Sequence, residues 1–200
     1  IVDTFFGVDQ QRALDDFELA TYQAIKDRYS SNIILHAFQF VVNTYSIENH
    51  LIESFFSSMR SDLSKKKHSS ETYDEYVYGS AEVVGLMCLR VFTKNDQTLY
   101  KSLVEPAKKL GSAFQKVNFF RDIKEDFFEK GRTYFPGFEI EKNLNDVQKS
   151  NIEDEISNEF EEALKGIYKL PLTSRFGVLL ACRYYKKLFK PVSYTHLTLP

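Results

Sequence analysis

The 200-residue sequence has little of what marks several large classes of protein. Its 26 basic and 28 acidic residues give a net charge of −2, so no basic excess attracts nucleic acid. The two cysteines, Cys88 and Cys182, lie far apart in apolar helical surroundings, which favours reduced core residues over a disulfide or metal pair. No apolar run reaches the length of a membrane span. These features predict a soluble chain with one core.

Motifs for several kinds of chemistry are also missing. The four histidines show no metal-ligand spacing, and the sequence holds no glycine-rich phosphate loop, no Cys-x-x-Cys and no nucleophile elbow. The alternation typical of half-buried strands does not occur, and no internal repeat is present. A helical protein that uses other polar groups is therefore indicated.

Helical periodicity runs through the whole chain and predicts an all-α bundle of roughly antiparallel helices. Asp9 is expected to cap the first helix, and Pro106 to disturb a long one. The run 65–70 is interpreted as a solvated connection, and 130–142 as the one extended loop. The expected helices cover residues 9–28, 32–45, 48–66, 72–93, 96–129, 146–168 and 175–189.

One of these helices carries a stripe of oxygen-bearing side chains. Gln115, Asn118, Asp122 and Asp126 follow at steps of three, four and four residues, so they share one helical face. Two carboxylates one turn apart repel each other, and their apolar flanks argue against a solvated, salt-bridged face, the alternative interpretation. Magnesium suits such a stripe because it prefers hard oxygen ligands and completes its shell with water and phosphate oxygens.

Three blocks in the same order resemble the phytoene and squalene synthase family. The segment from Gln115 to Asp126, with Gly131-Arg-Thr-Tyr-Phe-Pro136 after it, is similar to the family's second aspartate-rich motif. The segment Tyr76–Met87 resembles a family helix with the pattern Tyr-x-x-x-x-Ala-x-x-x-Gly. Met59–Leu63 resembles the family's Met-Arg-x-Asp-Leu segment. The residues in these blocks are most similar to those of bacterial phytoene synthases.

The resemblance implies a prenyltransferase that joins two prenyl diphosphates head to head. Two C20 geranylgeranyl diphosphates would give phytoene through prephytoene diphosphate; the alternative is squalene or dehydrosqualene synthase acting on C15 farnesyl diphosphate. An alternative of another class is a non-catalytic helical assembly factor, which the intact acidic motif disfavours. Ionisation requires neutralisation of the leaving diphosphate, so Mg²⁺ is the expected cofactor, with Mn²⁺ as a substitute and NADPH only for squalene.

The resemblance also assigns roles to residues. Tyr76, Asp122 and Asp126 are the expected catalytic residues, and Tyr76 is expected to point at the reacting carbons. Salt bridges to Glu125 or Glu129 are the alternative for Arg121. The expected metal ligands are Asp3, Asn118, Asp122 and Asp126; the expected substrate-binding residues are Ala81, Gly85, Gln115, Asn118, Arg121, Arg132 and Tyr134; the candidate aromatic walls are Phe5, Phe6, Phe38, Phe40, Phe119 and Phe120.

The two ends are interpreted as truncations. Residues 1–5 resemble the tail of the family's first aspartate-rich motif, with Asp3 as its second carboxylate. Residues 192–200 match the translation of a sequencing-library adapter and are expected not to be native, which leaves 1–191 as a partial prenyl-synthase domain. With half of the first motif missing, this fragment is expected to be inactive. The expected location is cytoplasmic, with peripheral membrane contact for product release, and the oligomeric state is left open.

Overall fold

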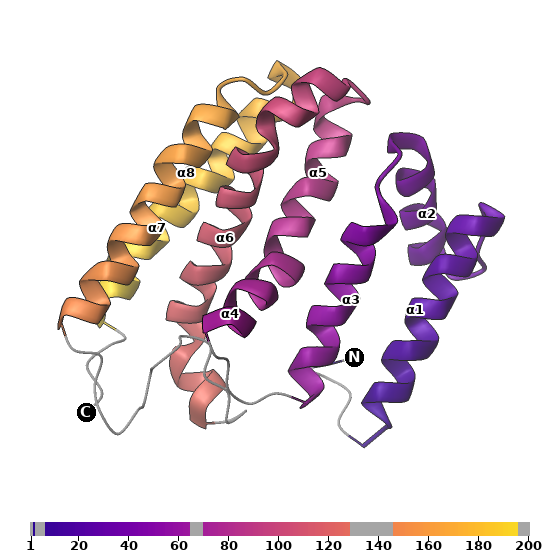
Figure 1. Ribbon diagram of the computed structural model, residues 1–200, viewed down its shortest axis with the longest axis horizontal. Coiled ribbons are helices and arrows are strands. Elements are labelled where there is room, and N and C mark those ends of the chain that lie inside the picture. The colour runs from indigo at the N-terminus through magenta and orange to yellow at the C-terminus, as the bar shows by residue number, and fades with distance from the viewer. Residues whose placement is uncertain (1, 3–6, 65–69, 129–145, 196–200) are drawn as a thin grey trace.

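The computed structural model describes residues 2, 7–64, 70–128 and 146–195, and every regular element within these ranges is helical (Figure 1). The side chains of 64, 70, 71, 123–128, 146–149 and 190–195 lie outside this description. The all-α prediction is therefore confirmed. The elements are α1 (Gln10–Asp27), α2 (Ile33–Tyr45), α3 (Asn49–Ser64), α4 (Ser70–Val77), the π-helical η1 (Tyr78–Glu82), α5 (Val83–Thr93), α6 (Gln97–Phe128), α7 (Asp146–Ile167) and α8 (Leu172–Thr195).

Local capping explains why the first helices begin where the sequence predicts. The Asp9 carboxylate accepts a hydrogen bond from the Arg12 amide at 3.0 Å. The Asn32 side chain does the same for the amides of Ile34 and Leu35. Each cap satisfies donors that the first helical turn leaves without an intrahelical partner.

Two predicted helices differ from the structure in their interior or bounds. The helix expected over 72–93 contains the π-helical turn η1, where a side chain on Gly79 would meet the Ser54 carbonyl oxygen at 2.5 Å. The last helix begins earlier than predicted, because the Pro171 carbonyl accepts hydrogen bonds from the amides of Ser174 and Arg175. Its backbone continues to Thr195, beyond the predicted end.

The helix α6 continues through Pro106 without a break and is the element around which its neighbours pack. It packs against α5, η1, α7 and α8, whereas α1, α2 and α3 form the opposite side of the bundle (Figure 1). A side chain on Gly166 of α7 would lie 2.2 Å from the Pro106 Cβ, so the proline ring is embedded in the contact between these helices. Tight packing there offsets the hydrogen bond that proline cannot make.

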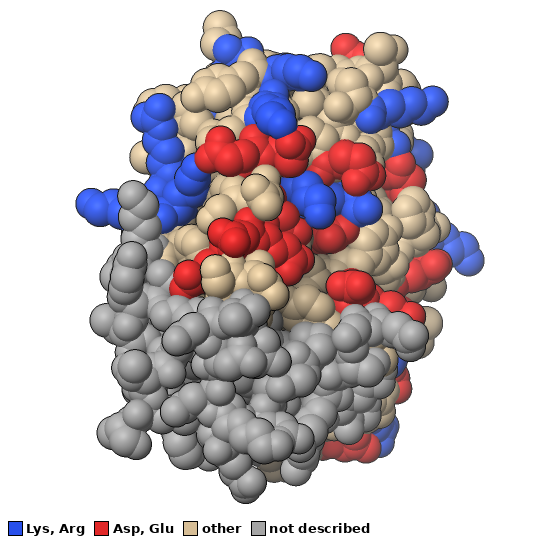
Figure 2. Space-filling model, turned by 60° about the vertical axis from the view of Figure 1, so that its left-hand side comes forward, with Lys and Arg blue, Asp and Glu red and all other residues tan. Residues whose placement is uncertain are grey.

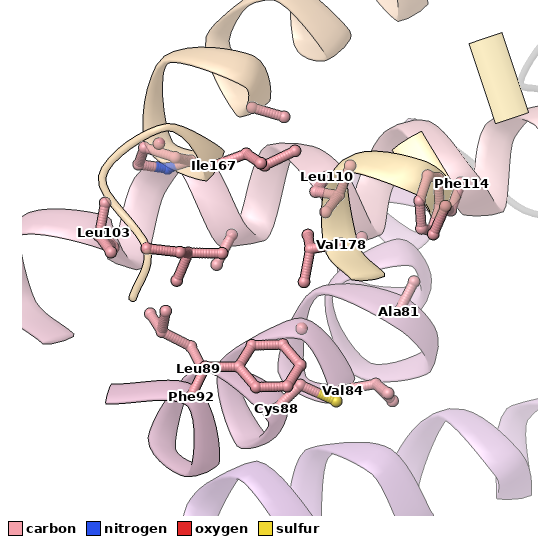
Figure 3. A pocket seen from close by; sticks show the side chains of 18 of the residues that line it. Ala81, Val84, Cys88, Leu89, Phe92, Leu103, Leu110, Phe114, Ile167 and Val178 are labelled. Carbon is pink, nitrogen blue, oxygen red and sulfur yellow. The ribbon is translucent and has the colours of Figure 1, made fainter. Parts of the chain in front are cut away.

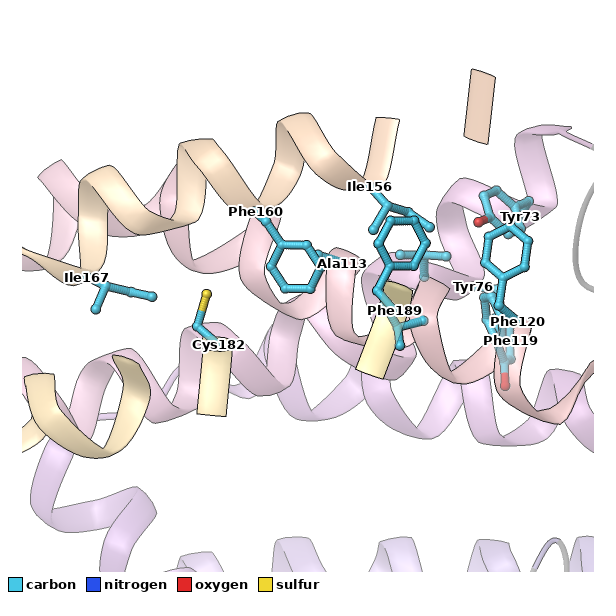
Figure 4. Packing of buried hydrophobic residues seen from close by; sticks show 12 residues of the cluster. Tyr73, Tyr76, Ala113, Phe119, Phe120, Ile156, Phe160, Ile167, Cys182 and Phe189 are labelled. Carbon is cyan, nitrogen blue, oxygen red and sulfur yellow. The ribbon is translucent and has the colours of Figure 1, made fainter. Parts of the chain in front are cut away.

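The core divides into clusters on either side of α5 and η1. One cluster joins α4, α6, α7 and α8, and Phe120, Ile156 and Phe160 are almost fully buried in it (Figure 4). Another joins α1, α2, α3 and α5 around Leu51 and Ile52. Cys182 is a reduced core residue, as predicted, but Cys88 is exposed, so the prediction of a core position for Cys88 is wrong.

Charged side chains of both signs cover the side of the molecule formed by α7 and α8. Figure 2 shows acidic and basic groups interspersed there rather than separated by sign. Lys186 of α8, for example, pairs with Glu161 of α7 at 2.6 Å. Among the helices that the structure describes, none combines the length and apolar character needed to cross a membrane.

Glycines let η1 and α5 approach α6 at backbone distance. A Cβ on Gly111 of α6 would lie 2.6 Å from the Ala81 carbonyl oxygen, and one on Gly85 would lie 2.8 Å from the Ala107 carbonyl oxygen. Both distances are far below van der Waals contact, and the opposing atoms are backbone. Neither glycine can take a side chain unless the helices move apart.

Gly111→Ala is therefore expected to destabilise the fold, because overpacking at a backbone contact costs about 1–3 kcal/mol. The matched control is Gly177→Ala on α8, where a Cβ would meet nothing within 4 Å. That variant is expected to gain roughly 0.5–1 kcal/mol, since alanine is the better helix former. Denaturant unfolding of both variants measures the difference. A Gly111→Ala protein as stable as the Gly177→Ala protein contradicts the close-approach argument.

Candidate active site

A cavity of about 650 Å³ lies between α5, α6, α7 and α8 (Figure 3). Its walls are mainly apolar and come from Val84 on α5, Leu110 on α6, Ile167 on α7 and Val178 on α8. The close-up shows Ala81 and Phe114 toward one end and Leu89, Phe92 and Leu103 toward the other. A volume of this size suits a small molecule with a long apolar part.

Polar groups gather near one end of this cavity. Ser80, Gln115 and Asn118 line it, and the Gln115 amide nitrogen donates to the Ser80 hydroxyl at 3.4 Å. The Asn118 Oδ1 is buried and has no hydrogen-bond partner among the residues that the structure describes. A buried amide oxygen without a partner costs about 1–3 kcal/mol. Its position on the cavity wall fits a ligand that is bound there, such as a metal ion or a metal-bound water.

Asp122 follows one turn after Asn118 on α6. Its two carboxylate oxygens accept hydrogen bonds from the Nε and Nη2 of Arg121 at 2.8 and 2.7 Å. This fork raises the pKa of the Arg121 guanidinium. Arg121 thus pairs with Asp122 itself; the side chains of its predicted alternative partners, Glu125 and Glu129, are not among those described.

The helix α6 places the backbone of Asp126 one further turn along the same stripe. Its side chain, and the whole of Asp3, Arg132 and Tyr134, lie outside the described residues. Among the residues that are described, no group of three or more His, Cys, Asp and Glu side chains is arranged to hold a metal ion. The oxygen donors present, Asn118 and Asp122, are of the type that Mg²⁺ prefers.

Tyr76 is buried, and it contacts a residue to which the sequence assigned no chemical step. Its hydroxyl donates to the Asp62 carboxylate at 3.0 Å, and its ring packs on Phe119 with centroids 6.0 Å apart. It lines a second, polar pocket of about 670 Å³ together with Ser58 and Arg60. Tyr76 is not among the residues that line the apolar cavity, so its predicted approach to the reacting carbons stays a prediction.

Ala81 and Gly85 lie on the cavity wall, where prenyl tails were expected to pass. Of the aromatic candidates, Phe119 and Phe120 are buried in the core and Phe40 is 63% exposed on α2. The aromatic lining comes instead from Phe92, Phe114 and Tyr185. The sequence predicted the helix α8 but assigned none of its residues to the site, because an apolar helical position does not show whether it faces the core or a cavity. Tyr185 of α8 stacks on Phe114 with ring centroids 4.0 Å apart.

Comparison with known sequences identifies the family to which this chain belongs. The family model for squalene/phytoene synthase matches residues 1–193. Phytoene synthase from Daucus carota is 29% identical over 170 residues, which cover 76% of this chain and 42% of the carrot protein. The bifunctional lycopene cyclase/phytoene synthase of Phycomyces blakesleeanus is 31% identical over 162 residues, covering 70% of this chain and 27% of that protein. The chain therefore spans less than half the length of these two relatives.

Solved structures share the arrangement of helices. A squalene synthase from Alicyclobacillus acidocaldarius superposes with a TM-score of 0.81 at 18% identity, covering 98% of this chain and 78% of that one. A dehydrosqualene synthase in complex with a ligand gives a TM-score of 0.80 at 22% identity, with coverages of 95% and 71%. The fold is thus that of the isoprenoid synthases. Within that class the chain belongs to the squalene/phytoene synthase family, a family of prenyltransferases.

The metal-binding role predicted for Asp122 and Asp126 can be tested by thermal unfolding, without an activity assay. Mg²⁺ with inorganic pyrophosphate is expected to raise the Tm of the protein, because ligands that bind only the folded state stabilise it. Asp122→Asn and Asp126→Asn should each remove most of that rise while leaving the Tm without metal unchanged or slightly higher, since neutralising one carboxylate relieves repulsion. The matched control is Glu161→Gln on the surface of α7. A full Mg²⁺ response in the Asp122→Asn protein would contradict the metal assignment.

Proposed function

We propose that this chain is part of an enzyme that condenses two geranylgeranyl diphosphates head to head to phytoene, through prephytoene diphosphate, with Mg²⁺. The observation that carries the proposal is a single cavity with apolar walls and a cluster of oxygen donors near one end. A prenyl diphosphate has the same division into a charged head and an apolar tail. Family membership supports the reaction class, and the alternative product remains squalene or dehydrosqualene.

At the polar end, some residues would bind the metal and others the diphosphate head group. Asn118 and Asp122 would hold Mg²⁺ together with Asp126 and Asp3, and the bound ion would supply charge neutralisation for the leaving diphosphate. The Gln115 side-chain amide, which also donates to the Ser80 hydroxyl, can donate to a phosphate oxygen. If Asp122 held the metal, the Arg121 guanidinium would be available to pair with phosphate oxygens. Arg132 and Tyr134 would also contact the substrate, as the resemblance implies.

Along the tail, the chain's own side chains protect cationic intermediates. Walls of Val84, Leu110 and Val178 exclude water and present no nucleophile. The rings of Phe114 and Tyr185 also line this cavity. Aromatic faces attract cations, so these rings would stabilise a cationic intermediate. Asp62 holds the Tyr76 hydroxyl in one orientation, and the catalytic role of that tyrosine stays a prediction.

The length of the cavity favours a C20 tail over a C15 tail. Both Gln115 at the polar end and Leu103 at the far end line the cavity, and twelve residues of α6 separate them. Twelve residues of helix span about 18 Å. An extended chain advances roughly 1.1–1.2 Å per bond, so four prenyl units of four bonds each need about 18 Å and three units about 14 Å. Phe92 and Leu103 would then meet the end of a geranylgeranyl chain.

The product distinguishes the proposed reaction from its alternative. Incubation with geranylgeranyl diphosphate and Mg²⁺ is expected to yield phytoene without a nicotinamide cofactor, because the final cation loses a proton and needs no hydride. The assay is best made on a protein that carries both acidic motifs, with Asp122→Asn as the inactive control. Turnover of farnesyl diphosphate to squalene that accelerates with NADPH would overturn the choice of product.

Occupation of the cavity can be followed on this chain through its two cysteines. Cys88 is exposed and lines the cavity, whereas Cys182 is buried and serves as the silent control. Geranylgeranyl thiolodiphosphate with Mg²⁺ is expected to slow alkylation of Cys88 at least fivefold, and pyrophosphate with Mg²⁺ should leave the rate unchanged. The apolar cavity walls beside the Cys88 sulfur keep part of the water away and raise the pKa of the thiol, so alkylation is measured above neutral pH, where more thiolate forms. Equal rates with and without the prenyl ligand would contradict binding of the tail in this cavity.

A further inference from the structure

A buried group of charges lies on the face of α6 that points away from the cavity. The side chains of Lys116 on α6 and Glu159 on α7 are each 5% exposed, and the Lys116 Nζ lies 2.8 Å from the Glu159 Oε1. The same oxygen accepts from the Ser112 hydroxyl at 3.0 Å and from the Lys109 Nζ at 3.3 Å. Glu155, one turn earlier on α7, pairs with Lys116 from the solvent side.

A contribution to stability does not explain why these charges are buried. Removing a lysine and a glutamate from water costs about as much as their attraction returns, and apolar pairs of similar size are often as stable. The Glu159 Oε2 is buried and has no hydrogen-bond partner among the described residues, which adds to the cost. Burial by itself would lower the pKa of Lys116, but the charges of Glu159 and Glu155 outweigh it and raise the pKa, so the lysine stays charged.

The rest of the interface between α6 and α7 is apolar around these charges. Phe114, Val117 and Phe160 belong to the cluster that joins the two helices. Apolar contacts are non-directional, so they permit small rotations of one helix on the other. An ion pair with fixed donors and acceptors does not, and buried polar pairs are best attested as devices that fix helix register.

We propose that Lys116 and Glu159 are positioning residues that fix the rotation and register of α6, so that Gln115, Asn118 and Asp122 meet the metal and the diphosphate. This inference rests on the proposed function of the cavity. The pair lies in the same turns of α6 as the polar stripe, one residue after Gln115 and two before Asn118. Side-chain atoms lie about 5–6 Å from a helix axis, so a rotation of about 20° moves them roughly 2 Å. That displacement equals a whole Mg²⁺–oxygen bond of about 2.0–2.1 Å.

The test separates positioning from stability with a double variant. Lys116→Met is expected to lower the Tm, because it leaves Glu159 buried with a weaker set of partners. Lys116→Met combined with Glu159→Met removes both charges and should restore the Tm to the wild-type value or above it. The second readout is the Mg²⁺ concentration that gives half-maximal protection of Cys88 by geranylgeranyl thiolodiphosphate. For the double variant we expect this concentration to rise at least tenfold despite the restored Tm.

The matched control is the exposed pair of the neighbouring interface. Lys186→Met combined with Glu161→Met removes the same residue types between α7 and α8, where the side chains are 36% and 63% exposed. Its half-saturating Mg²⁺ concentration is expected to equal that of the wild type. If the double Lys116 and Glu159 variant also stays within twofold of the wild type, the pair is purely structural and the inference is overturned.

Two further outcomes are informative. If the double variant does not fold, Glu159→Gln replaces it, because glutamine keeps the shape and can still accept from Ser112. We expect that variant to fold and to need at least threefold more Mg²⁺, and an unchanged requirement overturns the inference. If the wild-type protein itself shows no Mg²⁺-dependent protection of Cys88, the proposed function fails first and the inference with it. That result differs from a failure confined to the variants.

Discussion

The close approach of α5, α6 and α7 is the constraint on which the rest of the structure depends. Gly111 brings α6 to backbone contact with η1, Gly85 does the same for α5 and α6, and the Pro106 ring packs against Gly166 between α6 and α7. Such contacts fix the helix axes, so the space left beside them is a defined cavity rather than a loose gap. Because the same three helices carry the cavity walls, a small displacement of any of them changes both packing and binding.

The helix α6 has to serve two environments at once. One face turns Gln115 and Asn118 to the cavity, where the Asn118 oxygen lacks a partner among the described residues, and the opposite face buries Lys116 against Glu159. Neither arrangement maximises stability. Both make sense if the helix must present its polar stripe at one rotation, because polar groups that are costly when unsatisfied also specify position.

The sequence predicted the helices well and the site in part. Asp9 and Asn32 give helix starts because their capping hydrogen bonds are local. The stripe on α6 was visible because helical spacing alone places its members on one face. Cys88 was assigned to the core, since an apolar neighbourhood in sequence does not reveal that a cavity opens beside it. The lining by Phe92 and Tyr185 was missed for the same reason.

Residue order and spacing by themselves thus determined the helical class, the caps and the polar stripe, and the motif blocks indicated the family. Only the tertiary structure decided which partner each polar group has. Asp62 meets the Tyr76 hydroxyl from another helix, and Lys116 reaches Glu159 across 43 positions. The physical reason is that helical periodicity is set by neighbours within one or two turns. Contacts between helices depend on how their axes pack, which no local pattern encodes.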